Sequence, residues 1–149
     1  MRFTIIGWNF RKTPVEVRDN LVLTPDQQVE LGHQLSNRFN LGGIAILSTC
    51  NRTEFFLVNA EQQLDQIIEM LEKYWKLSEL RESVYIIHNL DGVRHLFRVA
   101  SSLDSMVLGE PQILGQLKDA FQSFNEADLT RKLLHHLFTR AFSTAKRVR

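Results

Sequence analysis

The chain has 149 residues, of which 44% are hydrophobic and 23% are charged, and its formal net charge is +1. This composition is typical of one globular domain, or of two small subdomains that share a core. The single cysteine excludes an intramolecular disulfide and a metal site built from several cysteines. No apolar run approaches the ~20 residues that a membrane-spanning helix needs, and the first residues have no signal or transit character, so we expect a cytoplasmic protein without a membrane partner.

Strand and helix signals alternate through the first part of the chain. The apolar periodicity and the turn residues predict a strand over 2–8, a loop and short helix over 9–20, a helix over 24–39, strands over 42–49 and 53–60, a helix over 61–75 and a strand over 83–89. The start of the second helix is the best marked. Thr24 is a suitable N-cap, Pro25 takes the first helical position and Gln27 completes a capping box.

This order of elements is that of a split βαβ motif, so we expect a ferredoxin-like antiparallel sheet with its helices on one face. After His88 the signals are helical only, over 91–105, over 112–124 and from near Thr130. The predicted fold is therefore α+β, with a sheet subdomain over about 1–90 and a helical subdomain over about 91–149. The last helix shows no stop signal before Arg149, which indicates a piece of a longer protein.

Positive charge gathers in the last predicted helix. Nothing acidic follows Asp128, and the cations of this stretch are Arg131, Lys132, Arg140, Lys146, Arg147 and Arg149. A basic helix of this kind lies near phosphates, or it presents a solvated face to water. The residues alone leave both interpretations open.

The only cysteine lies in the stretch STCNRTE, residues 48–54, with Arg52 two positions after it and Glu54 four positions after it. A free cysteine is often a buried hydrophobic side chain, but a neighbouring cation favours the reactive thiolate. If residues 50–52 stay extended, Cys50 and Arg52 share a face. Arg52 would then stabilise a thiolate, bind a substrate carboxylate, or form a strand-end salt bridge with Glu54. These roles stay open at the level of the residues.

Further polar candidates follow in the helical part. His95 lies at the edge of a predicted helix stripe, where a histidine acts as an acid or a base, or simply reaches solvent. Residues 105–116 offer hydroxyl, carboxylate and amide groups around a helix N-terminus, where they would hold a small polar substrate or only cap the helix. The seven glycines never have the GxGxxG spacing and no Walker-type loop occurs, so the sequence shows no recognisable nucleotide cradle.

Three stretches taken together resemble glutamyl-tRNA reductase: GWNFRKTPVEVRD, STCNRTE and HLFRVASSLDSMVLGEPQILGQLKDAF. The resemblance spans nearly the whole chain and covers only the N-terminal catalytic domain of that family. It implies an NADPH-dependent reduction of glutamyl-tRNA to glutamate-1-semialdehyde, the first step of tetrapyrrole (5-aminolevulinate) biosynthesis, through a cysteinyl thioester. It also implies that NADPH binds to a domain absent from this chain, that a dimerisation domain is absent too, and that neither metal nor flavin takes part.

The resemblance assigns roles residue by residue. Cys50 matches the catalytic nucleophile, His95 matches a histidine implicated in activity, and Arg52 matches the partner of the substrate carboxylate. The substrate-binding positions that it implies are Thr49, Asn51, Arg52, Ser105, Glu110, Pro111, Gln112 and Gln116. The chain departs from the family pattern at Phe10, Lys12 and Ser102.

The implied partners are glutamyl-tRNA, a second copy of the full-length enzyme, and a glutamate-1-semialdehyde aminomutase that takes over the product. Two other classes are alternatives. A cysteine-dependent esterase or hydrolase would use Cys50 and His95 on small esters. An RNA-binding module without catalysis would use the sheet, although Phe55, Phe56 and Tyr85 do not follow the aromatic pattern of sheet-type RNA binders.

Overall fold

A computed structural model describes residues 1–104 and 112–148. Its elements in chain order are β1 (Phe3–Asn9), α1 (Val15–Leu21), α2 (Pro25–Phe39), β2 (Gly43–Ser48), β3 (Arg52–Val58), α3 (Leu64–Trp75), α4 (Leu80–Ser83), β4 (Tyr85–His88), α5 (Asn89–Ala100), α6 (Gln112–Glu126) and α7 (Arg131–Val148). The predicted strands and helices are confirmed with shifts of a few residues at their ends, except that the helix predicted over 91–105 ends at Ala100. The four-residue helix α4 was not predicted.

The four strands form one sheet in the order β2-β3-β1-β4, and every neighbouring pair is antiparallel. In the central pair, Phe3 lies opposite Val58 and Asn9 lies opposite Arg52. This order and these directions confirm the predicted ferredoxin-like α+β arrangement. The register brings the end of β1 beside the start of β3, so the loop after β1 lies next to the β2–β3 turn.

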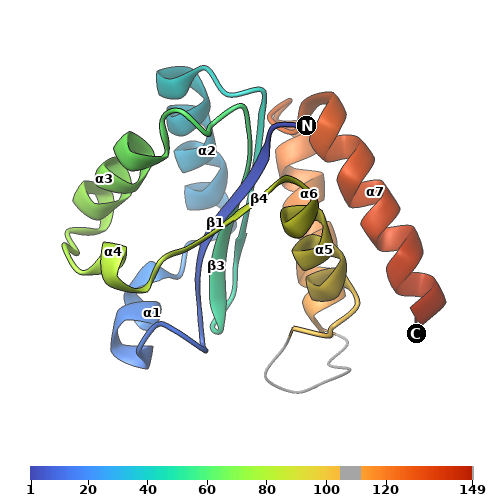
Figure 1. The fold of residues 1–149 in the computed structure, drawn as a ribbon, viewed down its shortest axis with the longest axis horizontal. Coiled ribbons are helices and arrows are strands. Elements are labelled where there is room, and N and C mark those ends of the chain that lie inside the picture. Colours follow the sequence, from blue (N-terminus) through green and yellow to red (C-terminus); the bar gives the residue numbers. More distant parts are fainter. Residues whose placement is uncertain (105–111, 149) are drawn as a thin grey trace.

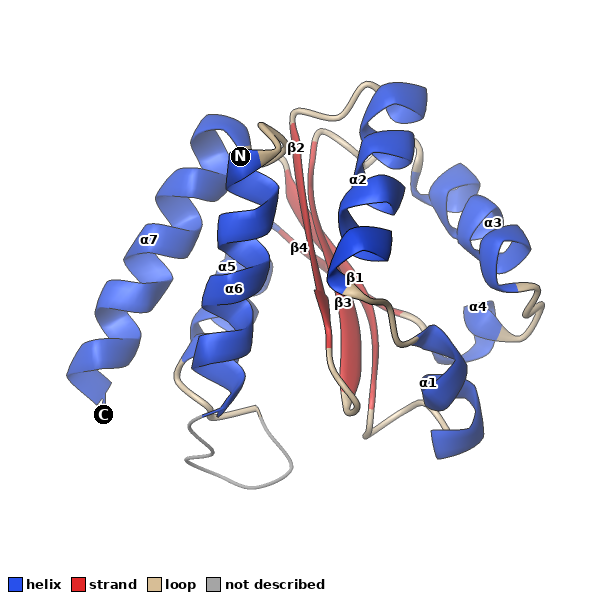
Figure 2. Cartoon of the chain, turned by 180° about the vertical axis from the view of Figure 1, so that it is seen from behind, coloured by secondary structure: helices blue, strands red, loops and turns tan. Residues whose placement is uncertain are grey.

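Helices cover both faces of the sheet. In Figures 1 and 2, α1 to α4 lie on one face and α5 to α7 lie on the other. The helices between the strands therefore share one face, as predicted, and the C-terminal helices take the second, where α6 and α7 pack against β2 and α5 packs against β1. Every residue of β1 and β3 is buried as a result. None of the helices in the described ranges is long and apolar enough to span a membrane.

Aromatic side chains fill the space on each side of β3. Phe55 makes edge-to-face contacts with Trp8 and Trp75 at ring separations of 6.3 and 6.2 Å, whereas Phe56 contacts Phe138 of α7 at 5.2 Å. Successive strand residues point to opposite faces, so the pair Phe55–Phe56 joins both helical layers to the sheet. The Trp8 Nε1–H donates to the backbone oxygen of Leu80 at 2.9 Å, which satisfies the one polar atom of that buried ring.

Helix α2 begins as its sequence predicts. Thr24 Oγ1 accepts from the Gln27 N–H at 3.2 Å, and Gln27 Oε1 accepts from the Thr24 N–H at 2.9 Å, which forms the capping box. The helix ends at Asn40, whose left-handed backbone (φ 52°) is a conformation that asparagine tolerates. Because α2 packs along β2, it supports the strand that leads directly to Cys50.

Candidate active site

The tight turn between β2 and β3 carries Cys50 and Asn51, where the chain bends. The Thr49 N–H donates to the Arg52 carbonyl at 2.8 Å, and Thr49 Oγ1 accepts from the N–H groups of Asn51 and Arg52, each at 3.2 Å. The Asn51 carbonyl accepts from the Phe10 N–H at 2.9 Å. Two predicted substrate-binding residues, Thr49 and Asn51, therefore also fix the shape of the turn that presents the cysteine.

Cys50 is exposed and free. The interpretation of this residue as a small hydrophobic side chain of the core is therefore wrong. The premise that residues 50–52 continue as an extended strand is also wrong, because the bend turns the cysteine toward solvent while Arg52 is only 2% exposed. Within residues 1–104 and 112–148 the thiol makes no hydrogen bond. An accessible thiol on a rigid turn is a suitable geometry for a nucleophile.

Arg52 is held from two directions. Its Nη1 donates to Asp104 Oδ2 at 3.1 Å and lies 3.5 Å from Glu54 Oε2, and its Nη2 donates to the backbone oxygen of Asp104. The other carboxylate oxygen of Asp104 accepts from Arg11 at 2.5 Å. Burial would lower the pKa of Arg52, but the negative charges around it, with Glu54 foremost, raise that pKa above its usual value. The guanidinium is thus a permanent buried cation.

Glu54 is the fully buried centre of the site. Its Oε2 accepts from His95 Nε2 at 2.5 Å and from the Tyr85 hydroxyl, so α5 and β4 both reach this strand through one oxygen. Burial would raise the pKa of Glu54, yet the charge of His95 and its hydrogen bond lower that pKa below the usual value. The side chain is therefore a buried carboxylate at neutral pH.

His95 and Tyr85 respond in turn to the charge of Glu54. Burial would lower the pKa of His95, but the charge and hydrogen bond of Glu54 raise it above 6.5. Burial, followed by the charge of Glu54, places the pKa of Tyr85 well above 10. Asp104 follows the same logic as Glu54, since burial would raise its pKa but Arg11 and Arg52 lower it. The site is a compact network of fixed charges.

Most of this network was not predicted from the sequence. Glu54 was considered only as a salt-bridge partner of Arg52, and no role in the site was predicted for Tyr85, Asp104 or Arg11. One signal was present, because a glutamate within the apolar stretch TEFFLV lies on the same side of the strand as Arg52, two positions away. Asp104 has no comparable signal, because its contact with Arg52 depends on how α5 packs on the sheet.

Two of the remaining predicted residues are described by the structure, and neither contacts this network. Gln112 and Gln116 are both exposed on α6. Gln116 borders a pocket of about 150 Å³ together with Ser48, two positions before Cys50. The other predicted substrate-binding residues, Ser105, Glu110 and Pro111, lie outside the described residues.

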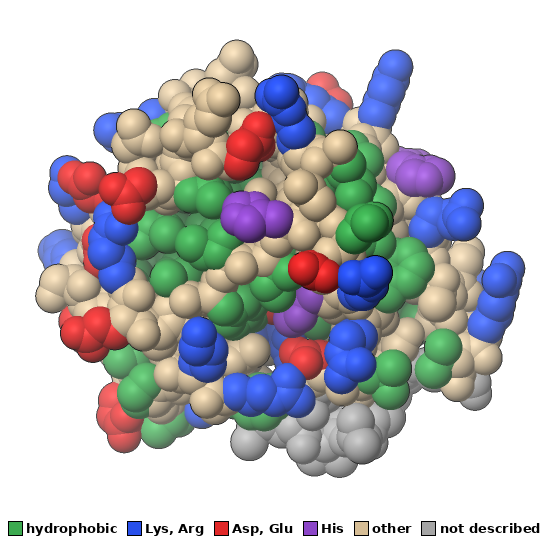
Figure 3. Space-filling model, viewed as in Figure 1, with side chains coloured by type: hydrophobic (Ala, Val, Ile, Leu, Met, Phe, Trp, Pro, Cys, Tyr) green, Lys and Arg blue, Asp and Glu red, His purple; other side chains and the backbone are tan. Residues whose placement is uncertain are grey.

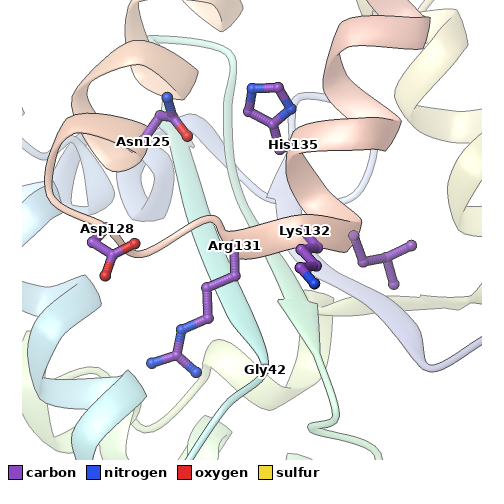
Figure 4. Close-up of a pocket in the computed structure, with 7 residues that line it drawn as sticks. Gly42, Asn125, Asp128, Arg131, Lys132 and His135 are labelled. Atoms are coloured by element: carbon purple, nitrogen blue, oxygen red, sulfur yellow. The ribbon is translucent and has the colours of Figure 1, made fainter.

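Two further pockets differ in their relation to the site. One of about 190 Å³ is lined by Asn9, Arg11, Lys12, Tyr85, Ile87, His95 and Asp104, so it opens on the charge network. The other, of about 730 Å³, lies at the opposite end of β2 from Cys50, where Gly42 meets the start of α7 (Figure 4). Among the described residues, no group of three or more His, Cys, Asp or Glu side chains is placed to hold a metal ion.

Comparison with known proteins shows which family this chain belongs to. The model of the family described as "Glutamyl-tRNAGlu reductase, N-terminal domain" matches residues 6–149. The chain belongs to this family. It is 47% identical to a glutamyl-tRNA reductase of Ectopseudomonas mendocina and 46% identical to one of Pseudomonas aeruginosa, in alignments that include all of this chain but 35% and 36% of those proteins. The chain thus spans about a third of the length of these curated relatives.

A solved structure gives the same answer. The glutamyl-tRNA reductase from Methanopyrus kandleri superimposes with a TM-score of 0.83 at 26% sequence identity, over 99% of this chain and 34% of that one. The ferredoxin-like sheet with its second helical layer is therefore the fold of the N-terminal domain of glutamyl-tRNA reductase. The stretch STCNRTE, which suggested the resemblance, holds the exposed cysteine, the buried arginine and the central glutamate of the site.

Proposed function

We propose that this chain is the part of a glutamyl-tRNA reductase that binds glutamyl-tRNA and forms the acyl-enzyme. The complete reaction is the NADPH-dependent reduction of glutamyl-tRNA to glutamate-1-semialdehyde, the first step of tetrapyrrole biosynthesis. One observation carries the proposal. The exposed thiol of Cys50 lies on a tight turn directly before a buried arginine that Asp104 and Glu54 hold in place.

The covalent step uses the chemistry of an activated ester. The Cys50 thiolate attacks the carbonyl carbon, a carbon–sulfur bond forms, the carbon–oxygen bond of the ester breaks, and the ribose oxygen leaves and takes up a proton from His95 or from water. The product is a glutamyl thioester on Cys50 and a free tRNA. Thioester formation divides one difficult reduction into two easier steps, because a thioester accepts hydride more readily than a carboxylate does.

Arg52 is the proposed partner of the substrate carboxylate, together with the turn residues Thr49 and Asn51. Its planar guanidinium is held at two nitrogens, so its orientation is set before a ligand arrives. The substrate then shares Arg52 with Asp104 instead of having to order a mobile side chain. Gln112 and Gln116 of α6 are further proposed substrate-binding residues, as are Ser105, Glu110 and Pro111.

His95 acts in this proposal as an acid or as a fixed positive charge. Glu54 holds its imidazole at 2.5 Å and raises its pKa above 6.5, which favours the protonated form near neutral pH. A cysteine-dependent hydrolase would instead need a neutral histidine on the thiol as its base. Because His95 is bonded to Glu54, we place that alternative behind the reductase.

NADPH would supply the hydride when bound, but the residues of this chain do not fit a dinucleotide cradle. The seven glycines lack the spacing that brings a backbone close to a pyrophosphate. We therefore derive no step through NADPH and assign its binding to the two thirds of the relatives' length that this chain does not span. Dimerisation, hand-over of the product to an aminomutase and a cytoplasmic location belong to the same proposal for the whole enzyme.

Mass spectrometry of the protein after incubation with glutamyl-tRNA tests the proposal. We expect a glutamyl adduct on Cys50 without any added NADPH, and slow hydrolysis of that adduct by water. Cys50→Ser is the matched control, since it keeps the shape of the turn and removes the thiol. The absence of an adduct, under conditions where tRNA binding is demonstrated, would contradict the proposal and favour an RNA-binding module.

A further inference from the structure

The solvent-facing side of α7 is basic or hydroxyl-bearing up to Arg147, and only the last residue of the helix, Val148, exposes an apolar side chain. The exposed positions from 131 to 147 are Arg131, Lys132, His135, His136, Thr139, Arg140, Ser143, Lys146 and Arg147. We call these residues the basic face of α7. Figure 3 shows Lys, Arg and His side chains along the right-hand edge of the molecule, where α7 lies in Figure 1.

Among the described residues, the lysines and arginines of the basic face have no carboxylate partner, and Arg131 donates to the backbone oxygen of Leu41 at 2.9 Å. On α3, Lys73 pairs with Glu69 at 3.3 Å, and on α5, Arg94 pairs with Asp91 at 2.8 Å. The ion pairs found within residues 1–104 and 112–148 include none of the lysines or arginines of α7. A solvated helix face normally intersperses acidic residues. This face has none, because no Asp or Glu follows Asp128.

The arrangement is unfavourable for an isolated helix. Lys132, His136 and Arg140 follow one another at intervals of four residues, so basic side chains lie along one line of the helix. Arg131 and Lys132 lie in the first turn of α7, next to the positive end of the helix dipole, and this turn contains no acidic residue. A bound polyanion would offset the unfavourable charge at this end of the helix. The charge pattern therefore points to a polyanionic partner rather than to water.

The shape of the surface favours an extended partner over a small anion. The pocket of about 730 Å³ at the start of α7 is lined by Lys132 and His135, but their side chains point away from each other, and the carboxylate of Asp128 also borders it (Figure 4). These groups do not converge on one point. The 18 residues of α7 extend over about 27 Å, and the face continues along this length.

The direction of α7 connects the face to the site. In both ribbon views the C-terminal end of α7 lies toward the same end of the molecule as the β2–β3 turn that carries Cys50 (Figures 1 and 2). We propose that the basic face of α7 binds the sugar–phosphate backbone of the tRNA whose acylated end reaches Cys50. This inference rests on the proposed function. Proteins recognise double-stranded RNA largely through phosphates and 2′-hydroxyls, which a row of cations fits.

The salt dependence of tRNA binding tests the inference. Deacylated tRNA is the probe, and its binding constant is measured by fluorescence anisotropy over a series of salt concentrations. The test variant carries Lys132→Gln, Arg140→Gln and Arg147→Gln. The matched control carries Arg38→Gln, Lys73→Gln and Lys76→Gln, which removes three exposed cations from α2 and the end of α3 on the other side of the sheet.

We expect the slope of log K against log [salt] to become shallower by about 2 to 3 in the test variant and to change little in the control. Equal slopes in the two variants would overturn the inference. So would a change in self-association of the test variant at an unchanged slope, because the face would then serve a second copy of the chain. Circular dichroism verifies the fold, and if the triple variant unfolds, each single variant is expected to reduce the slope by about 0.7 to 0.9.

The experiment separates this inference from the proposed function. Deacylated tRNA carries no ester, so Cys50→Ser is expected to leave the slope unchanged. If no adduct forms on Cys50 but the test variant has the expected shallower slope, only the proposed acyl transfer is contradicted. If the adduct forms but the test and control variants have equal slopes, only the proposed binding of tRNA to the basic face of α7 is contradicted.

Discussion

Arg52 and Asp104 lie 52 positions apart in the sequence and are joined at two points, through the carboxylate at 3.1 Å and through the backbone carbonyl of Asp104. The pair connects the first residue of β3 to the segment that follows α5. Arg11 completes it, because it binds the second oxygen of the same carboxylate. The orientation of the Arg52 guanidinium therefore depends on a residue that follows helix α5.

Asp104→Ala is expected to lower the free energy of unfolding by about 3 kcal/mol, because it removes the carboxylate partner of the buried Arg52 and leaves the backbone carbonyl of residue 104 and the 3.5 Å contact to Glu54. Urea unfolding measures this. The matched control is Asp91→Ala, which breaks the exposed pair with Arg94 and should cost at most about 1 kcal/mol. Similar losses in the two variants would mean that Asp104 does not hold Arg52.

Glu54→Gln is expected to lower the pKa of His95, since burial remains while the negative charge disappears. Nuclear magnetic resonance titration of the imidazole measures the shift. Tyr85→Phe keeps the carboxylate and removes only a hydroxyl, so it should leave the His95 pKa raised. If Glu54→Gln left the pKa of His95 unchanged, Glu54 would not be the cause of its shift.

The stability of the protein should depend on pH in two windows. His95 has a raised pKa in the folded state, so its contribution is complete below pH 6.5 and is lost as pH rises through the folded pKa. Glu54 has a lowered pKa, so its contribution is present above pH 4.5 and is lost as pH falls through the folded pKa.

Urea unfolding of wild type and His95→Gln, measured from pH 6.5 upward, separates the contribution of His95 from that of Glu54. We expect wild type to lose stability more steeply as pH rises, by at most about 1.4 kcal/mol per pH unit. In both proteins the other charged and titratable groups around position 95 are Glu54, Tyr85, Arg52 and Asp104, so their own pH dependence contributes to both curves. Parallel curves would show that His95 binds no extra proton on folding.

Cys50→Ser is expected to change the free energy of unfolding by less than about 0.5 kcal/mol, because the thiol is exposed and packs against no core. Iodoacetamide should modify Cys50 of the folded protein at the rate seen in urea, corrected for denaturant. Protection of the thiol in the folded state would contradict the exposed position.

Gly7→Ala is expected to displace Tyr85, because a Cβ at this position would lie 2.6 Å from the Tyr85 hydroxyl oxygen and 2.7 Å from Cζ. The pKa of Tyr85, held well above 10 by burial and by Glu54, should then fall toward 10, and stability should fall by about 1 to 3 kcal/mol. Ultraviolet absorbance titration follows the tyrosine. Gly115→Ala is the control, since nothing lies within 4 Å of its new methyl group.

Local sequence patterns were sufficient to predict the fold and one part of the candidate site. The capping box at Thr24 and the alternating strand and helix signals depend on neighbours in the chain, and the order of elements then left few topologies. Cys50 and Arg52 were found because they lie two positions apart in one short stretch. The burial of Arg52 was not predictable, because this side chain is covered only when the segment after α5 packs on the second face of the sheet.

The connections of Glu54 illustrate the same limit. Its partners His95 and Tyr85 lie 41 and 31 positions away, and each comes from a different element. A glutamate within a strand reads as an exposed or edge residue by composition. Only the three-dimensional arrangement shows that it is enclosed and charged.

The topology also sets the order in which a growing chain can acquire its site. β1 is made first, but its two neighbours in the sheet, β3 and β4, follow at residues 52–58 and 85–88. Such distant pairings are slow to form because long loops must close first. A nascent chain that has not yet reached Asp104 already contains Cys50 but lacks the carboxylate that holds Arg52. The thiol is therefore made early in synthesis, whereas the charge network of the candidate site is complete only after Asp104 has been added.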